Sequence, residues 1–167
     1  MKKLVLLLAV VLLSNSDLFS QSGPYSIGLR LGGGSEFGAE LSYQHTLGGN
    51  GRLEADLGFY NHHTKDYGTN GFKLTGIYQW VLPIDNGFYW YFGGGVSVGN
   101  YSYVYYDDDK FNKHGTFLSI PLNIGIEYRI PKAPLNFSLD FRPELGVLYP
   151  TNRLFGAGIA LGIRYTL

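Results

Sequence analysis

The chain has 167 residues, of which 13 are basic and 13 acidic, and it contains no cysteine. Disulfides, thiolate metal sites, thiol catalysis and a lipidated N-terminal cysteine are therefore excluded, and the balanced charge lacks the basic excess that nucleic-acid binding requires. With 24 glycines, 14 tyrosines and 11 phenylalanines, the composition is typical of strands and turns rather than helices.

Residues 2–21 have the layout of an export signal. Lys2 and Lys3 form a basic start, residues 4–13 an unbroken apolar run, and residues 14–20 a polar exit. The apolar run is too short to span a bilayer, which favours a cleaved signal peptide over a retained N-terminal anchor. We predict cleavage after Ser20, so that residues 1–20 are the signal peptide and residues 21–167 form one domain with 11 basic and 12 acidic residues.

The mature chain alternates apolar with polar or small residues, the period of a β-strand that sends successive side chains to opposite faces. In the clearest case, the apolar positions from Leu118 to Tyr128 are separated by Ser, Pro, Asn, Gly and Glu. In chain order, the pattern predicts strands over 25–32, 37–44, 53–60, 72–80, 89–98, 118–129, 135–142 and 155–167. The alternation stays in phase across Pro121, which predicts a missing ladder hydrogen bond there rather than an inserted residue.

All the charges of the predicted strands fall on one face. They are Arg30, Glu40, Glu54, Asp56, Lys73, Glu127, Arg129, Asp140, Arg142, Glu144 and Arg164. This partition is what lipid enforces on the outside of a transmembrane barrel, whereas a soluble lipocalin-like barrel or a β-sandwich buries its apolar face instead. A β-sandwich remains the alternative.

Because buried charges persist only when paired, we expect these residues to form an ionic network in a closed interior. Arg142 and Glu144 are expected to meet Glu127, Arg129 and Arg164 on neighbouring strands.

Aromatic residues gather near both ends of the apolar face, as in the interfacial belts of membrane proteins. One belt is predicted to contain Tyr43, Trp80, Trp90, Tyr128, Phe137 and Tyr165. The other is predicted to contain Phe37, Phe59, Phe72, Phe117 and Phe155.

The export signal, the eight alternating segments and the final Gly162-Ile163-Arg164-Tyr165-Thr166-Leu167 resemble the small bacterial outer-membrane β-barrels of the OmpA-domain and OmpX-like kind. The resemblance implies an all-β, eight-stranded, antiparallel up-and-down transmembrane barrel, assembled by the barrel-assembly machinery and surrounded by outer-membrane lipid. An even strand number places both termini and the turns at 48–51, 83–87 and 131–134 on the periplasmic side. The connections at 33–36, 61–70, 100–115 and 149–153 then lie outside.

No catalytic constellation stands out, and we expect neither an enzyme nor a cofactor. His62-His63, or the run 107–109 with Asn112, offers metal-ligand chemistry without convincing spacing, and a solvated loop is the favoured interpretation. Residues 32–34 and 93–95 resemble phosphate loops only in glycine content, so close backbone approach or strand curvature is favoured.

The sequence thus predicts a structural or surface-interaction barrel; the alternatives are a narrow channel and a lipid-modifying enzyme. Any extracellular partner is expected at the loop 100–115, because tyrosine gives large contact area at low entropic cost; the alternative is a solvated loop without a partner. The candidate residues of this loop are Tyr101, Tyr103, Tyr105, Tyr106, Asp107, Asp108, Asp109 and Phe111. The alternation continues through Tyr101, Tyr103 and Tyr105, which indicates that strands five and six extend above the membrane as a hairpin.

Overall fold

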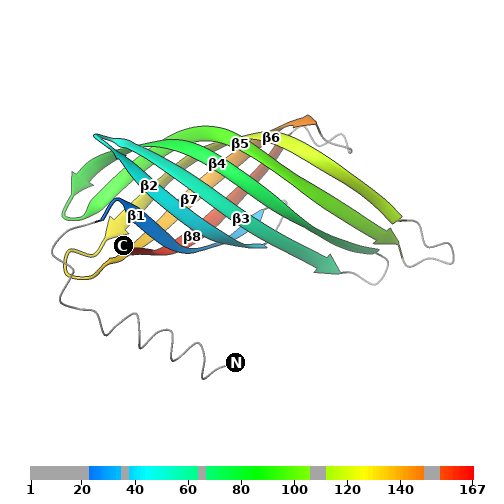
Figure 1. The fold of residues 1–167 in the computed structure, drawn as a ribbon, viewed down its shortest axis with the longest axis horizontal. Helices are drawn as coiled ribbons and strands as arrows, with labels where there is room; N and C mark the ends of the chain where they lie inside the picture. The colour runs from blue at the N-terminus through cyan, green and yellow to red at the C-terminus, as the bar shows by residue number, and fades with distance from the viewer. Residues whose placement is uncertain (1–22, 35–37, 64–66, 106–111, 149–154) are drawn as a thin grey trace, which may run out of the picture.

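The computed structural model describes residues 23–34, 38–63, 67–105, 112–148 and 155–167, so the predicted signal peptide lies outside the described part. The strands form one closed barrel in which each strand pairs antiparallel with its neighbours in the chain and β1 pairs with β8 (Figure 1). The strands are β1 Tyr25–Gly34, β2 Gly38–Gly48, β3 Gly51–His63, β4 Tyr67–Asp85, β5 Phe88–Tyr105, β6 Asn112–Arg129, β7 Leu135–Leu148 and β8 Phe155–Thr166. The predicted eight-stranded up-and-down barrel is confirmed.

Short turns join the strands at the end of the barrel where the C-terminus lies, on the left of Figure 1. Asn86 and Gly87 link β4 to β5 with φ of 48° and 88°. Positive φ at both central residues is the requirement of the tight hairpin turns that Asn-Gly favours. In the described ranges, no helix is long and apolar enough to cross a membrane.

Two of the predicted loops are mostly strand. The ladder continues to the pair His63 and Gly68 between β3 and β4, and to Val104 and Asn112 between β5 and β6. The predicted loop at 61–70 is therefore wrong, and the connection predicted at 100–115 is shorter than expected. The extension of strands five and six through Tyr101, Tyr103 and Tyr105 as a hairpin is confirmed. Apolar alternation marks only the part of a strand that has an apolar face, whereas the ladder itself needs no apolar side chains. The two hairpins consequently project beyond the shorter β1 and β2 (Figure 1).

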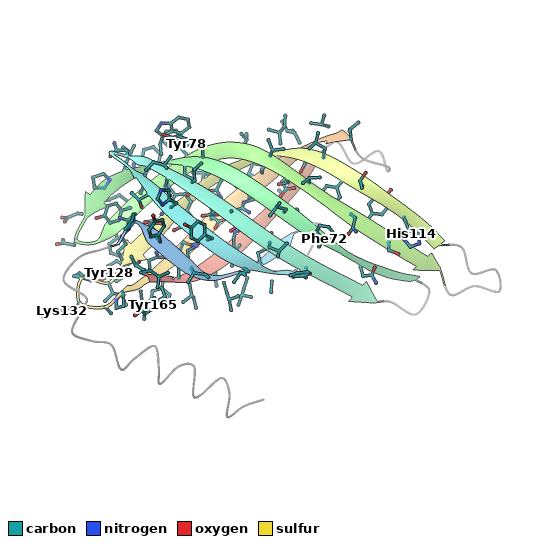
Figure 2. All side chains as sticks on the ribbon, in the orientation of Figure 1. Phe72, Tyr78, His114, Tyr128, Lys132 and Tyr165 are labelled. Atoms are coloured by element: carbon teal, nitrogen blue, oxygen red, sulfur yellow. The ribbon has the colours of Figure 1, made fainter. Side chains whose placement is uncertain are left out.

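The outer face of the barrel is apolar and the inner face is polar. Large apolar side chains such as Leu29, Leu122, Leu139 and Leu161 are 46–62 % exposed. Figure 2 shows side chains standing out from the barrel, Phe72 and Tyr78 among them. In the described residues, the buried side chains are mostly polar or charged, Arg164 and Glu127 among them. The polarity of an ordinary globular protein is thus reversed.

Aromatic side chains occupy both ends of the outer face. At the turn end, Trp80 stacks on Phe92 with ring centroids 5.5 Å apart, and Trp90 lies 5.3 Å from the same ring. Phe59 and Phe72 are exposed towards the loop end. Tyr43 and Phe137 are likewise exposed near the turns, and Tyr128 and Tyr165 are partly covered.

Phe117 does not belong to the outer belt. It is 2 % exposed and faces the lumen with the other odd-numbered residues of β6, such as Ser119 and Asn123. The prediction failed because Phe117 was assigned to the belt as an aromatic residue, although its place next to Leu118 in the alternation points it inward. Phe37 lies outside the described residues, and Phe155 is described only as part of β8.

Pro121 interrupts the ladder without shifting it. Ile120 pairs with Leu145 and Ile124 pairs with Phe141, so β6 and β7 keep one register across the proline. The register shift between these strands lies at Leu118 and Ser119 instead. The expectation that no residue is inserted at Pro121 is confirmed.

Gly95 lies where two strands approach closely. A Cβ atom at this position would overlap the carbonyl group of Gly76 on β4. A Cβ atom at Gly93 would likewise overlap the carbonyl oxygen of Tyr78, so close backbone approach accounts for glycine at 93 and 95.

Candidate functional site

The lumen is the most highly organised polar region that the structure describes. All eleven charged residues predicted for the interior take part in ion pairs there. Eight of them are buried, while Lys73, Glu144 and Arg129 are partly exposed. Alternation explains the placement, because each of these side chains has the parity that points inward on its strand.

Arg142 on β7 reaches across the barrel to β2 and β3. Its guanidinium lies 2.7 Å from a carboxylate oxygen of Glu54, 2.8 Å from Asp56 and 3.4 Å from Glu40. The predicted partners of Arg142 on adjacent strands were therefore wrong. In a closed barrel, the long side chains of one wall meet those of the opposite wall, and sequence neighbours in the ladder do not show this.

Arg30 binds two carboxylates from opposite directions. Its Nη1 donates to Glu40 at 2.6 Å, and its Nε and Nη2 both donate to Asp140, the shorter bond being 2.5 Å. The side chain of Asn123 donates to the same Asp140 at 3.3 Å. Bidentate geometry of this kind adds directional specificity to the charge attraction.

A second pair lies nearer the loop end. Lys73 on β4 contacts Glu144 on β7 at 2.8 Å and Glu40 at 3.7 Å. Ser119 donates a hydrogen bond to the other oxygen of Glu144 at 3.1 Å. Glu144 therefore pairs with Lys73 and not with the predicted residues Glu127, Arg129 and Arg164. As with Arg142, the partner lies on the opposite wall of the barrel and not on a neighbouring strand.

Arg52 is a lumen residue that the sequence prediction missed. It is 2 % exposed, pairs with Glu127 on β6 at 2.5 Å and donates to Gln79 at 2.7 Å. Arg52 lies two residues before Glu54 and therefore points to the same face, which is the signal that could have revealed it. It was missed because the predicted strand began at residue 53, whereas β3 begins at Gly51. With Arg52 included, the described lumen charges are six positive (Arg30, Arg52, Lys73, Arg129, Arg142, Arg164) and six negative (Glu40, Glu54, Asp56, Glu127, Asp140, Glu144).

Tyr91 fills the middle of the lumen between these charges. It is fully buried, its ring lies 4.9 Å from the guanidinium carbon of Arg52, and its hydroxyl donates to Asp140 at 3.4 Å. A cation over an aromatic face and a hydroxyl bonded to a carboxylate satisfy both the apolar and the polar part of the side chain.

Neutral polar groups complete the network. Glu54 accepts hydrogen bonds from Gln44 at 2.6 Å, from Gln79 at 3.2 Å and from Arg164 at 3.3 Å. Arg164 also donates to the hydroxyls of Ser42 and Ser138. Amides and hydroxyls thus lie between the ion pairs and connect them into one hydrogen-bonded network.

Arg129 marks the turn end of the network. Its side chain is 40 % exposed, contacts Glu127 at 2.6 Å and lies over the ring of Tyr89, 4.1 Å from the centroid. It is thus the least buried partner among the lumen arginines.

The predicted surface-interaction residues are described only in part. Tyr101 is half-buried, and Tyr103 and Tyr105 belong to β5. Tyr106, Asp107, Asp108, Asp109 and Phe111 lie outside the described residues. Within the described ranges, no group of three or more metal-ligating side chains is present.

Comparison with known proteins identifies the fold. No family model matches the chain, and no curated protein matches its sequence. Among solved structures, Neisserial surface protein A is similar at a TM-score of 0.65 and 11 % identity, covering 86 % of this chain and 94 % of that one. The N-terminal β-barrel domain of Pseudomonas aeruginosa OprF is similar at 0.62 and 15 % identity, covering 87 % of this chain and all of that domain.

The chain has the fold of the small outer-membrane β-barrels. The outer-membrane enzyme PagL also shares it, with a TM-score of 0.52, 8 % identity and coverage of 85 % of this chain and 99 % of that one. The same barrel is therefore found in a surface protein and in an enzyme, and function has to be argued from the residues of this chain.

Proposed function

We propose that this chain is a bacterial outer-membrane barrel with a closed, ion-paired lumen and a non-enzymatic structural or surface-interaction role. The observation that carries the proposal is the reversed polarity of the barrel. Its outer face presents exposed leucines, isoleucines and aromatics, while the lumen holds balanced charges. In a transmembrane barrel, each strand places apolar side chains against lipid on one face and polar or paired charged side chains in the lumen on the other.

The two tryptophans of the chain supply a direct test of membrane insertion. Trp80 and Trp90 are the only tryptophans, both stand on the outer face, and they are 46 % and 40 % exposed. We expect their fluorescence to shift to the blue when the barrel folds into phospholipid vesicles. Lipids brominated near the headgroup should quench them more strongly than lipids brominated near the chain end, because aromatic belts lie at the interface. Folding of the barrel without quenching by either lipid contradicts the membrane assignment.

The closed lumen separates this proposal from a narrow channel. An eight-stranded barrel has an interior just wide enough for its side chains, and here Tyr91, Arg52 and Asp140 meet in the middle. The purified barrel in a planar bilayer is expected to give no steady conductance. Steady single-channel currents in the unmodified protein support the channel alternative instead.

The surface role is assigned to the projecting hairpin of β5 and β6, which includes the predicted region 100–115. Replacing residues 103–113 with a short Gly-Ser turn leaves the apolar band of both strands intact and is expected to abolish adhesion or partner binding while the barrel still assembles. If adhesion, partner binding and envelope properties are all unchanged in this variant, the hairpin is only a spacer and the surface-interaction role is wrong. For the enzyme alternative, lipid incubated with the folded barrel is examined by mass spectrometry, and a released or transferred acyl chain overturns the non-enzymatic role.

A further inference from the structure

The outer face changes from apolar to polar within one step of the ladder on β5 and β6, and within two steps on β4. Leu74 and Val98 are paired neighbours, as are Val98 and Leu118, and these side chains form the last fully apolar row. Beyond them, Phe72, Asn100 and Thr116 form the next row on the same face. The row after that consists of Asn70, Ser102 and His114. The ladder is unbroken here, so alternation keeps all three rows on the outside of the barrel.

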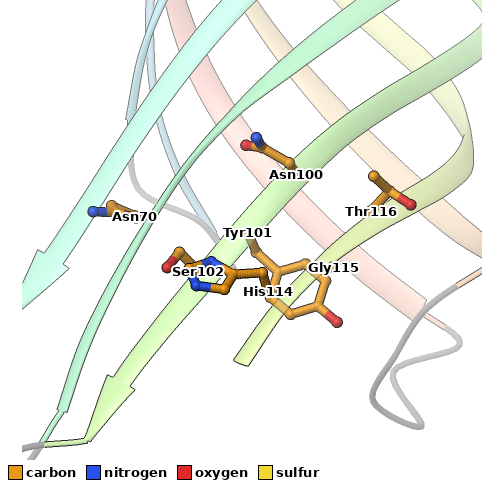
Figure 3. A pocket seen from close by; sticks show the side chains of 7 residues that line it. All are labelled: Asn70, Asn100, Tyr101, Ser102, His114, Gly115 and Thr116. Carbon is orange, nitrogen blue, oxygen red and sulfur yellow. The ribbon is translucent and has the colours of Figure 1, made fainter. Parts of the chain in front are cut away.

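A hollow of about 450 Å³ lies over these polar rows (Figure 3). Its lining residues are Asn70, Asn100, Tyr101, Ser102, His114, Gly115 and Thr116. The Oδ1 atom of Asn100 accepts a hydrogen bond from the backbone N–H of Phe72 at 3.2 Å, which fixes the amide at the edge of the apolar band. Tyr101 and Gly115 pair with each other and have the parity opposite to the outer rows. A Cβ atom at Gly115 would meet the ring and hydroxyl of Tyr101, so glycine leaves the space that the tyrosine occupies.

The lining is rich in hydrogen-bonding groups and carries no Asp, Glu, Lys or Arg. Amide, hydroxyl and imidazole groups both donate and accept, as the vicinal hydroxyls of a sugar require, whereas a phosphate group is bound best by arginine or lysine. The volume is within the range of small-ligand sites. Because the hollow is open, it is suited to a ligand held nearby rather than to one captured from dilute solution.

We propose that this hollow binds an uncharged sugar in the headgroup of a membrane glycolipid. The acyl chains of such a lipid lie along Leu74, Val98 and Leu118, and its headgroup then stands at the level of Ser102 and Thr116. Anchoring in the same membrane raises the effective concentration of the sugar, which compensates for a shallow site. The inference rests on the proposed function, because it requires the apolar band to be in lipid.

The test is lipid retention by the folded barrel. The barrel is folded into phosphatidylcholine vesicles that contain equal amounts of an uncharged diglycosyl diacylglycerol and a phosphatidylglycerol with the same acyl chains. After extraction in mild detergent, native mass spectrometry counts the retained lipids. We expect the glycolipid to be retained in preference to phosphatidylglycerol. Equal retention of the two lipids, or preference for phosphatidylglycerol, overturns the proposal.

Variants assign the binding to the hollow. The combined replacement Ser102→Ala and Thr116→Val is expected to lower glycolipid retention by at least about fivefold, since each removes a hydrogen-bonding hydroxyl. Thr46→Val, an exposed threonine near the turn end, is the matched control and should leave retention unchanged. Equal loss in the control, or no loss in the double variant, contradicts the assignment.

Two further arms separate the possible failures. The free headgroup disaccharide, added at the same total concentration, should not displace the lipid; displacement makes a soluble glycan the ligand and overturns the lipid assignment. Tryptophan quenching by brominated lipid is measured on the same samples. Absence of quenching removes the proposed function together with this inference, whereas normal quenching without glycolipid preference removes this inference alone.

Discussion

The two faces of each strand obey opposite rules although they belong to the same backbone. On the outer face, Leu139 and its neighbours differ little from one another, and any side chain of similar size and polarity satisfies the surroundings. On the inner face, Arg142 meets three particular carboxylates across the lumen. The outer face therefore requires only apolar side chains, whereas the inner face requires particular partners at particular positions.

The largest expected effect is on the inner face. Arg142→Ala leaves Glu40, Glu54 and Asp56 without their shared cation, and breaking a buried pair from one side costs about 3–5 kcal/mol. The loss is measured as the free energy of unfolding in urea, with the barrel in phospholipid vesicles. Lys132→Ala in the exposed β6–β7 turn is the control and should change stability by less than about 0.5 kcal/mol. If the two variants lose similar amounts of unfolding free energy, the ion pairs of the lumen do not stabilise the barrel.

The outer face is tested by Leu139→Arg, which places a charge in lipid. Leu139 pairs with Ile126 on one side and Leu161 on the other, so its surroundings are wholly apolar. The expected cost is about 2–4 kcal/mol near the bilayer midplane, measured by the same unfolding experiment. Leu139→Ile, which conserves volume, should cost less than about 1.5 kcal/mol. If both variants fold equally well in vesicles, the outer face does not lie in hydrocarbon.

Two glycines of paired strands sharpen the comparison further. Gly95 has the inward parity and has no room for a Cβ atom beside Gly76, whereas a Cβ at Gly76 meets nothing within 4 Å. Overpacking typically costs about 1–3 kcal/mol, so Gly95→Ala should destabilise the barrel by that amount and Gly76→Ala much less. Thermal unfolding in detergent ranks the two, and the reverse order speaks against the close approach of β4 and β5.

The smallest effect is expected at the edge of the network. Arg129 contacts the same Glu127 as Arg52, but its side chain is 40 % exposed against 3 % for Arg52. Solvent screens such a pair, so Arg129→Ala should cost about 0–1 kcal/mol and its effect should shrink further in high salt. Urea unfolding at low and high ionic strength provides the measurement. A loss as large as that of Arg142→Ala shows that the turn end of the lumen is drier than its exposure indicates.

Much of this molecule was predictable because a barrel strand has a period of two. Glu54 and Asp56 point inward and Leu57 belongs to the apolar set as soon as the strand is recognised, whatever its neighbours are. Arg52 shows the limit of the method: its parity is correct, but the predicted strand began after it. Phe117 shows the other limit, since an aromatic residue near a strand end was assigned to a belt against its parity.

Strand length was harder to predict than strand direction. Inside lipid, apolar alternation marks both the strand and its face. Beyond the apolar band, as from Asn61 to His63, the backbone ladder continues although the side chains no longer alternate between apolar and polar. The extension of β3 and β4 was therefore interpreted as a loop, whereas the tyrosines at 101, 103 and 105 still indicated the extension of β5. The polar hollow above Val98 was not visible in the sequence.

The sequence by itself determined the number of strands, the face on which each residue lies and the reversed polarity of the two faces, because these depend only on local alternation. The tertiary structure decided which charges meet. Closing the sheet brings β7 opposite β2 and β3, so that Arg142 reaches Glu54 and Lys73 reaches Glu144 across the lumen. No local sequence pattern encodes these contacts across the lumen, since they follow from the curvature and stagger of the whole barrel.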